Sequence, residues 1–402
     1  MIIENGLVFT ENFTFEPLTV QTQKDRIVKL SAPHTDDLDV TSLTVSSDCD
    51  KSSVTPDDTI FDASGCLVLP GLTDIHFHGC MGHDFCEGTK EALEAIASFS
   101  LSKGVTSICP ATMTLPKEEL SRICKTATDF ASSQQTTSAA ADLIGIHMEG
   151  PFINAHKKGA QNEAYIQTPS PTLLKDWQAD AKGLIKLVSL APELPGAIDC
   201  IKACHDTFHF SVAHTEADYE TAIDAFQNGA DHVTHLYNAM PPFTHRAPGV
   251  IGAAFDSPGC FAEIICDGVH ITPSAVRAAF RLFGKERMVL ISDSMEATGK
   301  PDGTYSLGGL SVNVCGNRAT LSDGTLAGSV TPLYECMRTA VSMGVPLADA
   351  VRAATLNPCR SIGMDHLYGS ISPDKKAHFL ILDKEDLSIR AVIKNQLLLC
   401  FS

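Results

Sequence analysis

The chain has few basic residues for its size. Its 30 Lys and Arg residues stand against 48 Asp and Glu residues, and the net charge is −18 over 402 residues. Binding to nucleic acid or to an anionic membrane needs clustered Lys and Arg that contact phosphates. The composition therefore argues against both partners. A small anionic substrate remains compatible, because a few local basic groups can bind it.

The sequence also lacks any run of about 18 uninterrupted apolar residues, so we expect no membrane-spanning helix. Its first residues, MIIENGLVFTENF, lack the basic start and apolar core of a signal peptide. The 14 cysteines are spread from Cys49 to Cys400 and form no CxxC pair. This distribution is typical of buried thiols in a reducing compartment, so we expect a cytoplasmic protein.

Three common catalytic signatures are absent as well. No GxSxG elbow follows a strand-like segment, and neither a Walker A motif nor a dinucleotide fingerprint occurs. The sequence therefore does not indicate a serine hydrolase with a GxSxG elbow, a Walker A nucleotide-binding fold or a dinucleotide-binding fold.

What the sequence does contain is a long series of alternating segments. Residues 1–69 include short strand-like runs, and residues 31–58 are rich in Ser, Thr and Asp, so we expect an exposed loop there. From Gly71 onward, eight short apolar runs appear, several separated by amphipathic stretches that end at Gly. The eight runs are LTDIHFHG, VTSICPATM, DLIGIHMEG, IKLVSLAPE, FHFSVAHTE, HVTHLYNAM, FAEIICDGVH and MVLISDSM.

Eight β-then-α units predict an α/β fold, a parallel (β/α)₈ TIM-type barrel with its active site at the C-terminal ends of the strands. We assign residues 70–368 to this barrel. Residues 369–402 return to short strands with turn signals. They are expected to pair with residues 1–69 in a small β-sandwich domain formed from both chain ends.

Polar side chains collect at the C-terminal tips of the predicted strands. His76 and His78 end the first run, and because residues two apart on a strand face the same way, they can aim at one point. The other runs that end in such residues contribute Glu149, His214, His235 and Asp293. Imidazole and carboxylate ligands suit zinc or a similar divalent ion. Such an ion can lower the pKa of bound water from about 15.7 to about 7.

Each of these residues also has a structural interpretation. An HxH pair such as His76 and His78 is more often incidental than metal-binding. His214 could be a hydrogen-bonded core histidine, and Asp293 could be a helix N-cap. Glu149 precedes Gly-Pro and could simply end a strand at a turn.

The coincidence of six such residues at the same end of five strands favours a metal site over these separate interpretations. Carboxylates and imidazoles are costly to bury unless they are paired or bound to metal. His147 faces the same way as Glu149, and we interpret it as a structural residue or as support for a ligand. We assign no function to the remaining histidines of these runs and their surroundings, His83, His209 and His232.

Longer motifs surround these residues. They are PGLTDIHFHG (70–79), HMEGPF (147–152), AHTEA (213–217), THLYNAMPPFTHRAPG (234–249), CDGVH (266–270), ISDSMEATG (291–299) and LAGS (326–329). In this order the motifs resemble the amidohydrolase superfamily and, within it, the N-acetylglucosamine-6-phosphate deacetylase family. The resemblance covers essentially the whole chain, including both parts of the small β-domain.

The resemblance implies roles that the residue types alone leave open. Glu149, His214 and His235 would hold the principal metal ion, and His76 and His78 would add a second metal position that some family members lack. Zinc is the expected ion, bound once or twice, with iron, manganese and cobalt as alternatives. Asp293 would be the general base that takes a proton from the attacking water and returns it to the leaving amine.

The resemblance also implies how a sugar phosphate would be bound. Asn238 and Ala239 would offer backbone amides, and His270 and Arg246 would offer side chains. Arg is suited to bidentate phosphate binding. In the family this Arg comes from the neighbouring subunit, so a homodimer is implied. Without the family, Arg246 would be interpreted as a solvated loop charge and His270 as a strand-end residue.

One position departs from the family pattern. Gln161 stands where the family usually has a His that hydrogen-bonds the substrate carbonyl and stabilises the developing oxyanion. A Gln donates a neutral amide N–H and cannot donate as an imidazolium does. Either the reaction is kept with less help from this donor, or Gln161 marks a related substrate such as another N-acetylhexosamine phosphate.

The function that the resemblance implies is hydrolysis of the acetamide of N-acetylglucosamine 6-phosphate. A second hypothesis is an amidohydrolase for a cyclic amide or an aminated base, but such sites often use a modified Lys in place of Glu149 and do not need Arg246 with His270. A third is a barrel without metal that serves as a binding scaffold. Relatives of that kind usually lack several ligands, whereas all six positions are present in this chain.

Overall fold

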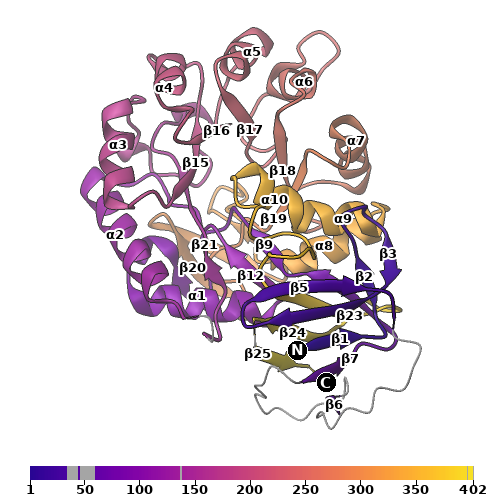
Figure 1. Cartoon of the computed structure of the whole chain (residues 1–402). Helices are drawn as coiled ribbons and strands as arrows, with labels where there is room; N and C mark the ends of the chain where they lie inside the picture. The colour runs from indigo at the N-terminus through magenta and orange to yellow at the C-terminus, as the bar shows by residue number, and fades with distance from the viewer. Residues whose placement is uncertain (34–43, 46–58, 136–137, 396, 402) are drawn as a thin grey trace.

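The computed structural model describes residues 1–33, 44–45, 59–135, 138–395 and 397–401 (Figure 1). Most of the loop expected at 31–58 lies outside these residues. Within the described ranges, no helix is both long enough and apolar enough to cross a membrane.

All eight strands expected from the apolar runs occur, and they run parallel. Six of them form one sheet in chain order from β14 to β19, and β9 pairs with β12 in a second sheet. A bridge between Ala111 and His147 links the two sheets on one side. On the other side, the Asp293 N–H donates to the His76 carbonyl at 2.9 Å. The strands are β9 (Leu72–Asp74), β12 (Val105–Ile108), β14 (Ile146–Glu149), β15 (Ile185–Leu190), β16 (His209–Val212), β17 (Ala230–Val233), β18 (Phe261–Ile265) and β19 (Met288–Ile291).

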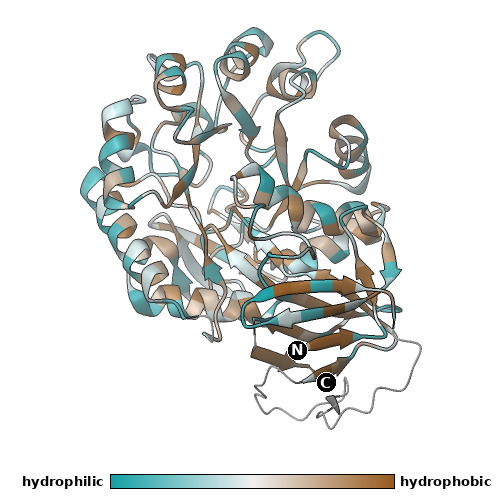
Figure 2. Cartoon of the chain, viewed as in Figure 1, coloured by the Kyte–Doolittle hydropathy of each residue, from teal (hydrophilic) through white to brown (hydrophobic). Residues whose placement is uncertain are grey.

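A helix follows each of these strands before the next one begins, and the helices lie around the outside of the strands (Figure 1). Buried apolar residues of these helices belong to the same cluster as residues of the strands. Figure 2 shows that the helices carry both hydrophobic and hydrophilic residues. Capping residues mark where some of these helices begin. Asp218 is the N-cap of α5, and its carboxylate accepts the Thr221 N–H at 2.9 Å, which satisfies one free donor of the first turn. The eight units form a TIM-like barrel. The helices are α1 (Lys90–Ser102), α2 (Lys117–Ser133), α3 (Pro171–Asp180), α4 (Ala197–Cys204), α5 (Tyr219–Gln227), α6 (Gly249–Asp256), α7 (Pro273–Phe283), α8 (Leu333–Ser342), α9 (Leu347–Ala354) and α10 (Leu356–Ser361).

Two further sheets lie beside the barrel, one built from N-terminal strands alone and one from strands of both chain ends. One sheet has the order β5-β4-β1-β7-β6, and the other has the order β25-β24-β23-β8-β2-β3. The two ends meet where β23 pairs antiparallel with β8, with Leu380 opposite Leu69. Buried residues from both sheets, such as Phe61 and Phe379, belong to one apolar cluster. The strands are β1 (Ile2–Glu4), β2 (Leu7–Phe9), β3 (Phe15–Pro17), β4 (Thr19–Gln23), β5 (Arg26–Ser31), β6 (Thr44–Val45), β7 (Ile60–Asp62), β8 (Cys66–Pro70), β23 (His378–Asp383), β24 (Ile389–Lys394) and β25 (Leu397–Cys400).

A small antiparallel sheet lies between β19 and α8 and was not anticipated from the sequence. It consists of β20 (Gly303–Leu307), β21 (Leu310–Cys315) and β22 (Arg318–Thr320). Its buried side chains pack with Met113 and Ala160, which belong to loops that follow β12 and β14. This sheet therefore covers part of the end of the barrel where those two loops lie. Shorter strands elsewhere are β10 (Gly79–Cys80), β11 (His83–Asp84) and β13 (Asp142–Leu143).

Candidate active site

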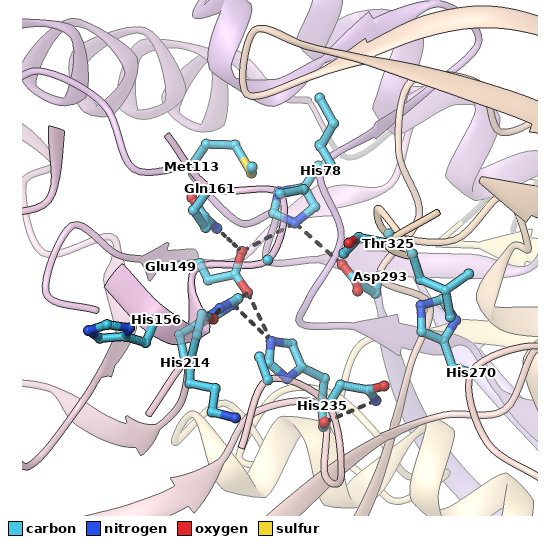
Figure 3. Close-up of a pocket in the computed structure, with 18 residues that line it drawn as sticks. His78, Met113, Glu149, His156, Gln161, His214, His235, His270, Asp293 and Thr325 are labelled. Atoms are coloured by element: carbon cyan, nitrogen blue, oxygen red, sulfur yellow. Dashed lines mark hydrogen bonds and ion pairs between the residues drawn. The ribbon is translucent and has the colours of Figure 1, made fainter. Parts of the chain in front are cut away.

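A cavity of about 370 Å³ opens at the C-terminal ends of the barrel strands. This is the end at which TIM barrels carry their active sites. Figure 3 shows side chains from several strands pointing into this one space. Among its lining residues, those that the sequence predicted for the site are His78, Glu149, Gln161, His214, His235, Asn238, Ala239, His270 and Asp293.

Four histidines converge on the carboxylate of Glu149, and we call these five residues the rim cluster: His76, His78, Glu149, His214 and His235. Glu149 Oε1 lies 3.2 Å from His76 Nε2, 3.1 Å from His214 Nε2 and 3.3 Å from His235 Nε2. Glu149 Oε2 lies 3.3 Å from His78 Nε2. All five residues are buried. The structure thus brings together the five residues that the sequence predicted as metal ligands.

The donor atoms of the rim cluster fit a divalent cation. His214 Nε2 lies 3.1 Å from His235 Nε2, a close approach of two ring nitrogens that a shared cation would explain. His76 Nε2 is buried without a hydrogen-bond partner among the described residues. The donors form two groups that share Glu149, one with His76 and His78 and one with His214 and His235. Nitrogen and carboxylate ligands in this number suit zinc and its neighbours in the first transition row.

The opposite ring nitrogens support this arrangement. His214 Nδ1 lies 2.8 Å from the Lys157 carbonyl, and His78 Nδ1 lies 3.3 Å from the Ala111 carbonyl. A carbonyl only accepts, so each of these Nδ1 atoms carries the proton. The Nε2 lone pairs are then free to bind a metal, which is how ligating histidines are usually held.

The backbone at the strand ends turns these side chains into the cavity. His214, His235 and Asp293 have φ angles of 44°, 34° and 48°. Non-glycine residues rarely adopt this left-handed region, and where they do it often marks a functional site. Three of the strand-end residues singled out from the sequence therefore share one uncommon conformation.

Asp293 lies at the edge of the rim cluster. Its Oδ1 is 3.3 Å from His78 Nε2 and 3.8 Å from His76 Nε2. Burial alone would raise the pKa of Asp293, but when His76 and His78 are protonated, the hydrogen bond from His78 and the charges of both rings outweigh burial and lower the pKa. An ionised carboxylate in this place can accept a proton from a molecule in the cavity.

Gln161 lines the cavity but is already held on two sides. Its Oε1 accepts the Thr114 backbone N–H at 2.6 Å, and its Nε2 donates to Glu149 Oε2 at 2.7 Å. The opposite amide orientation would set two donors and then two acceptors against each other, so these partners define the orientation. One of the two N–H bonds of Nε2 remains for a ligand.

The residues expected to bind a sugar phosphate are only partly brought together. Asn238, Ala239 and His270 line the cavity. Asp267 Oδ2 lies 2.7 Å from His270 Nδ1. Burial lowers the pKa of His270, but the hydrogen bond and the charge of Asp267 outweigh burial and raise the pKa. Arg246 is exposed on the loop before α6 and is not among the residues that line this cavity.

Two buried carboxylates near the site were missed from the sequence. Glu263, in the middle of β18, has its Oε2 2.9 Å from His76 Nδ1. Asp74 accepts a hydrogen bond from Ser292 Oγ at 2.6 Å, and burial raises the pKa of Asp74 to about 7 despite that bond. The available signal was a charged residue within an apolar strand run. His147, interpreted as structural or supporting, lies with its Nε2 2.8 Å from Ser189 Oγ.

Comparisons with known proteins agree with this geometry. The Amidohydrolase family matches residues 67–397. N-acetylglucosamine-6-phosphate deacetylase of Bacillus subtilis (strain 168) is 38% identical over 321 residues, which cover 79% of this chain and 81% of that protein. N-acetylgalactosamine-6-phosphate deacetylase of Escherichia coli O157:H7 is 33% identical over 79% of this chain and 84% of that protein.

A solved structure extends the similarity to the whole fold. A mutant of N-acetyl-D-glucosamine-6-phosphate deacetylase from Mycobacterium smegmatis, in complex with N-acetyl-D-glucosamine-6-phosphate, superposes with a TM-score of 0.87 at 28% identity and covers 100% of this chain and 99% of that chain. The family match spans most of the sequence, and it includes all five residues of the rim cluster and the strands that carry or precede them. The chain belongs to the amidohydrolase family.

Proposed function

We propose that this protein is a metal-dependent deacetylase that hydrolyses the acetamide of N-acetylglucosamine 6-phosphate to glucosamine 6-phosphate and acetate. The observation that carries the proposal is the convergence of four histidines on Glu149 beside Asp293 in one cavity. The sequence similarity to deacetylases of this name supports the choice of substrate. The reaction would belong to amino-sugar catabolism.

The metal would be held by the rim cluster. Glu149, His214 and His235 are proposed to bind the principal ion, and His76 and His78 to complete a second position with Glu149. Zinc suits this donor set, and iron, manganese or cobalt are the alternatives. When bound, such an ion lowers the pKa of a coordinated water and polarises a carbonyl oxygen.

Asp293 is proposed to move the proton of the reaction. Its Oδ1 would accept a proton from the water that attacks the acetyl carbon, and it would then donate that proton to the sugar nitrogen as the C–N bond breaks. The lowered pKa keeps the carboxylate ready to accept the proton. A group that serves first as base and then as acid must lie within hydrogen-bond reach of both atoms.

The phosphate is proposed to bind on the His270 side of the cavity. The raised pKa of His270 favours a charged ring that attracts an anion. The backbone amides of Asn238 and Ala239 would add neutral donors. Because the chain's own Arg246 does not line its cavity, we propose that Arg246 reaches the site of a neighbouring subunit in a homodimer.

Gln161 is proposed to donate its remaining N–H to the substrate carbonyl. Its other contacts, to Thr114 and Glu149, would hold that N–H in a fixed direction. A fixed donor loses little freedom in the transition state, which is the condition for effective oxyanion stabilisation.

An acetate-release assay tests the proposal with three substrates: N-acetylglucosamine 6-phosphate, its galacto epimer and the unphosphorylated sugar. We expect the first to be hydrolysed fastest. Equal rates with and without the phosphate would remove the proposed roles of Arg246 and His270. Preference for the galacto epimer would favour the alternative of an N-acetylgalactosamine 6-phosphate deacetylase, which the similarity to that enzyme and the presence of Gln161 both suggest.

Three further features belong to the proposal. The two sheets beside the barrel would form a β-sandwich domain from residues 1–69 and 369–402, with the catalytic barrel at 70–368. The described cysteines from Cys66 to Cys359 are free thiols, which supports a reducing, cytoplasmic location. No role is proposed for the acidic loop at 31–58.

A further inference from the structure

A carboxylate lies inside the barrel directly behind the rim cluster. Glu263 is 0% exposed, and Ile265, two residues later on the same strand, belongs to an apolar cluster with Leu187 and Val289 of other barrel strands. Glu263 Oε2 lies 2.9 Å from His76 Nδ1, whereas Oε1 has no hydrogen-bond partner among the described residues. Among the described residues the carboxylate thus has one hydrogen-bond partner, and that partner is a residue of the rim cluster.

A buried carboxylate with one partner is costly to keep. Removing an ion from water costs several kcal/mol, and good geometry with a compensating charge is needed to offset it. Burying an apolar side chain, such as that of Ile265 on the same strand, carries no such desolvation penalty. The presence of Glu263 therefore points to an interaction with a cation through His76.

Glu263 distinguishes His76 from the other three histidines. His78 and His214 have neutral backbone carbonyls at Nδ1, and His235 Nδ1 has no partner among the described residues. The Nδ1–H of His76 donates to an anion, so its Nε2 carries the lone pair that faces Glu149 Oε1. A carboxylate behind a ligating imidazole fixes the ring and makes it a stronger base.

We propose that Glu263 is a positioning residue that orients His76 and strengthens the metal position formed by His76, His78 and Glu149. The inference rests on the proposed function only in that it needs the rim cluster to bind metal. It assigns to this position an outer carboxylate that, among the described residues, the position of His214 and His235 lacks.

The test compares the purified wild-type protein with Glu263→Gln. The amide has the same shape and can still accept from His76 Nδ1, so the substitution removes mainly the charge. Zinc per chain is measured by elemental analysis, and zinc release is followed against increasing chelator. We expect one equivalent to bind about 10- to 100-fold more weakly in the variant, while the tighter equivalent is unchanged. Unchanged affinity and stoichiometry would overturn the proposal.

Two further variants separate positioning from a structural role. Asp231→Asn alters a carboxylate that also contacts two histidines, at the opposite end of the barrel, and it is expected to leave zinc binding unchanged. In a His76→Asn background, Glu263→Gln should cause no further loss of zinc affinity, because its effect passes through His76. The same loss in both backgrounds, or a lowered melting temperature with unchanged zinc binding, would contradict positioning.

The substrate proposal can fail independently. Zinc binding is measured without any sugar, so a wild-type protein that releases no acetate from the three sugars would refute the proposed function alone. Glu263→Asp provides a second charged variant: it keeps the charge but shortens the side chain, and an affinity between those of wild type and Glu263→Gln is expected. Weaker zinc binding in Glu263→Asp than in Glu263→Gln would show that the charge of residue 263 does not strengthen the metal position.

Discussion

Among the described residues, the strands β16 and β17 connect two of the barrel's clusters of histidine and carboxylate. The rim cluster includes His214 and His235, which follow β16 and β17. A second cluster, which we call the floor cluster, consists of His209, the first residue of β16, and of Asp231 and His232 within β17. In the floor cluster, and in each of the two groups of the rim cluster that share Glu149, the possible ligand atoms lie within 4.8 Å of one another. Residue types and proximity alone therefore do not distinguish them.

The distances do distinguish them. Asp231 lies 2.6 Å from His209 Nδ1 and 2.7 Å from His232 Nδ1, which are ordinary lengths for strong hydrogen bonds. In the rim cluster the Nε2-to-carboxylate distances are 3.1 to 3.3 Å. Two ligands that each lie about 2.1 Å from one ion at a tetrahedral angle are about 3.4 Å apart. The rim cluster thus has the spacing of ligands around an ion, and the floor cluster has that of a hydrogen-bonded triad.

The rim cluster and the floor cluster should differ most when the carboxylate of each cluster is removed. Glu149→Ala removes the carboxylate that both metal-binding groups share, so bound zinc should be lost. Because a catalytic metal stabilises the transition state by several kcal/mol, kcat/KM should fall by about 1000-fold or more. Asp231→Ala is the matched variant and should retain zinc and activity. Acetate release and elemental analysis measure both. Zinc loss in the Asp231 variant would erase the distinction between the clusters.

Asp293→Asn separates metal binding from proton transfer within the rim region. Asp293 belongs to neither metal group, so the variant should retain zinc. Without the carboxylate, proton transfer should slow, and kcat should fall by about 100- to 10,000-fold. Zinc content and kcat are measured on the same sample. If kcat were to fall only in proportion to lost zinc, Asp293 would be assigned to the metal and not to the proton.

Gln161→Ala should have a smaller effect than either change. It removes the proposed oxyanion donor, and the loss of one such donor costs at most about 100- to 1000-fold in kcat. It also frees Glu149 Oε2 from one hydrogen bond. We expect kcat to fall more than KM rises, and Gln161→His to keep more activity than Gln161→Ala. Unchanged turnover in Gln161→Ala would remove this residue from the mechanism.

The part of the site that the sequence predicted depends on strand ends. His76, Glu149 and Asp293 could be found because parallel barrel strands place their C-terminal tips at one end. Glu263 lies inside a strand, and its importance follows from a contact with His76 across the barrel that no local pattern encodes. The contact between Gln161 and Thr114 depends on loop conformation, which has no periodicity to interpret.

The eight barrel strands were likewise predictable from the sequence, whereas the additional antiparallel sheet beside the cavity was not. The eight apolar runs each gave a strand, because a parallel sheet covered by helices needs continuous apolar segments. The sheet of β20, β21 and β22 lies in a region without such a run, and its strands alternate between exposed and buried residues. Its packing on Met113 and Ala160 involves loops distant in sequence, so its place beside the cavity could only come from the structure.

Asp231→Asn should give the smallest effect, on stability and not on activity. Burial raises the pKa of Asp231, but its hydrogen bonds and charge interactions with His232 and His209 outweigh burial and lower the pKa. A folded-state pKa below the unfolded value means that ionised Asp231 stabilises the fold above pH 4 or so, and that this contribution is lost as the pH falls through the folded pKa. Because the Asp231 side chain is 35% exposed, solvent screening limits the expected loss to about 1 kcal/mol.

Chemical unfolding of wild type and Asp231→Asn across pH 3 to 7 measures this contribution. The free energies of unfolding should differ most near pH 6 and converge toward pH 3, while zinc content stays equal throughout the range in which zinc is bound. The neighbouring titratable groups are His209, His232 and Cys260, and the pKa of Cys260 is raised by burial and by Asp231, so Cys260 stays a neutral thiol over this range. If the difference in the free energy of unfolding between wild type and Asp231→Asn grew toward acid pH, the ionised carboxylate of Asp231 would not be what stabilises the floor cluster.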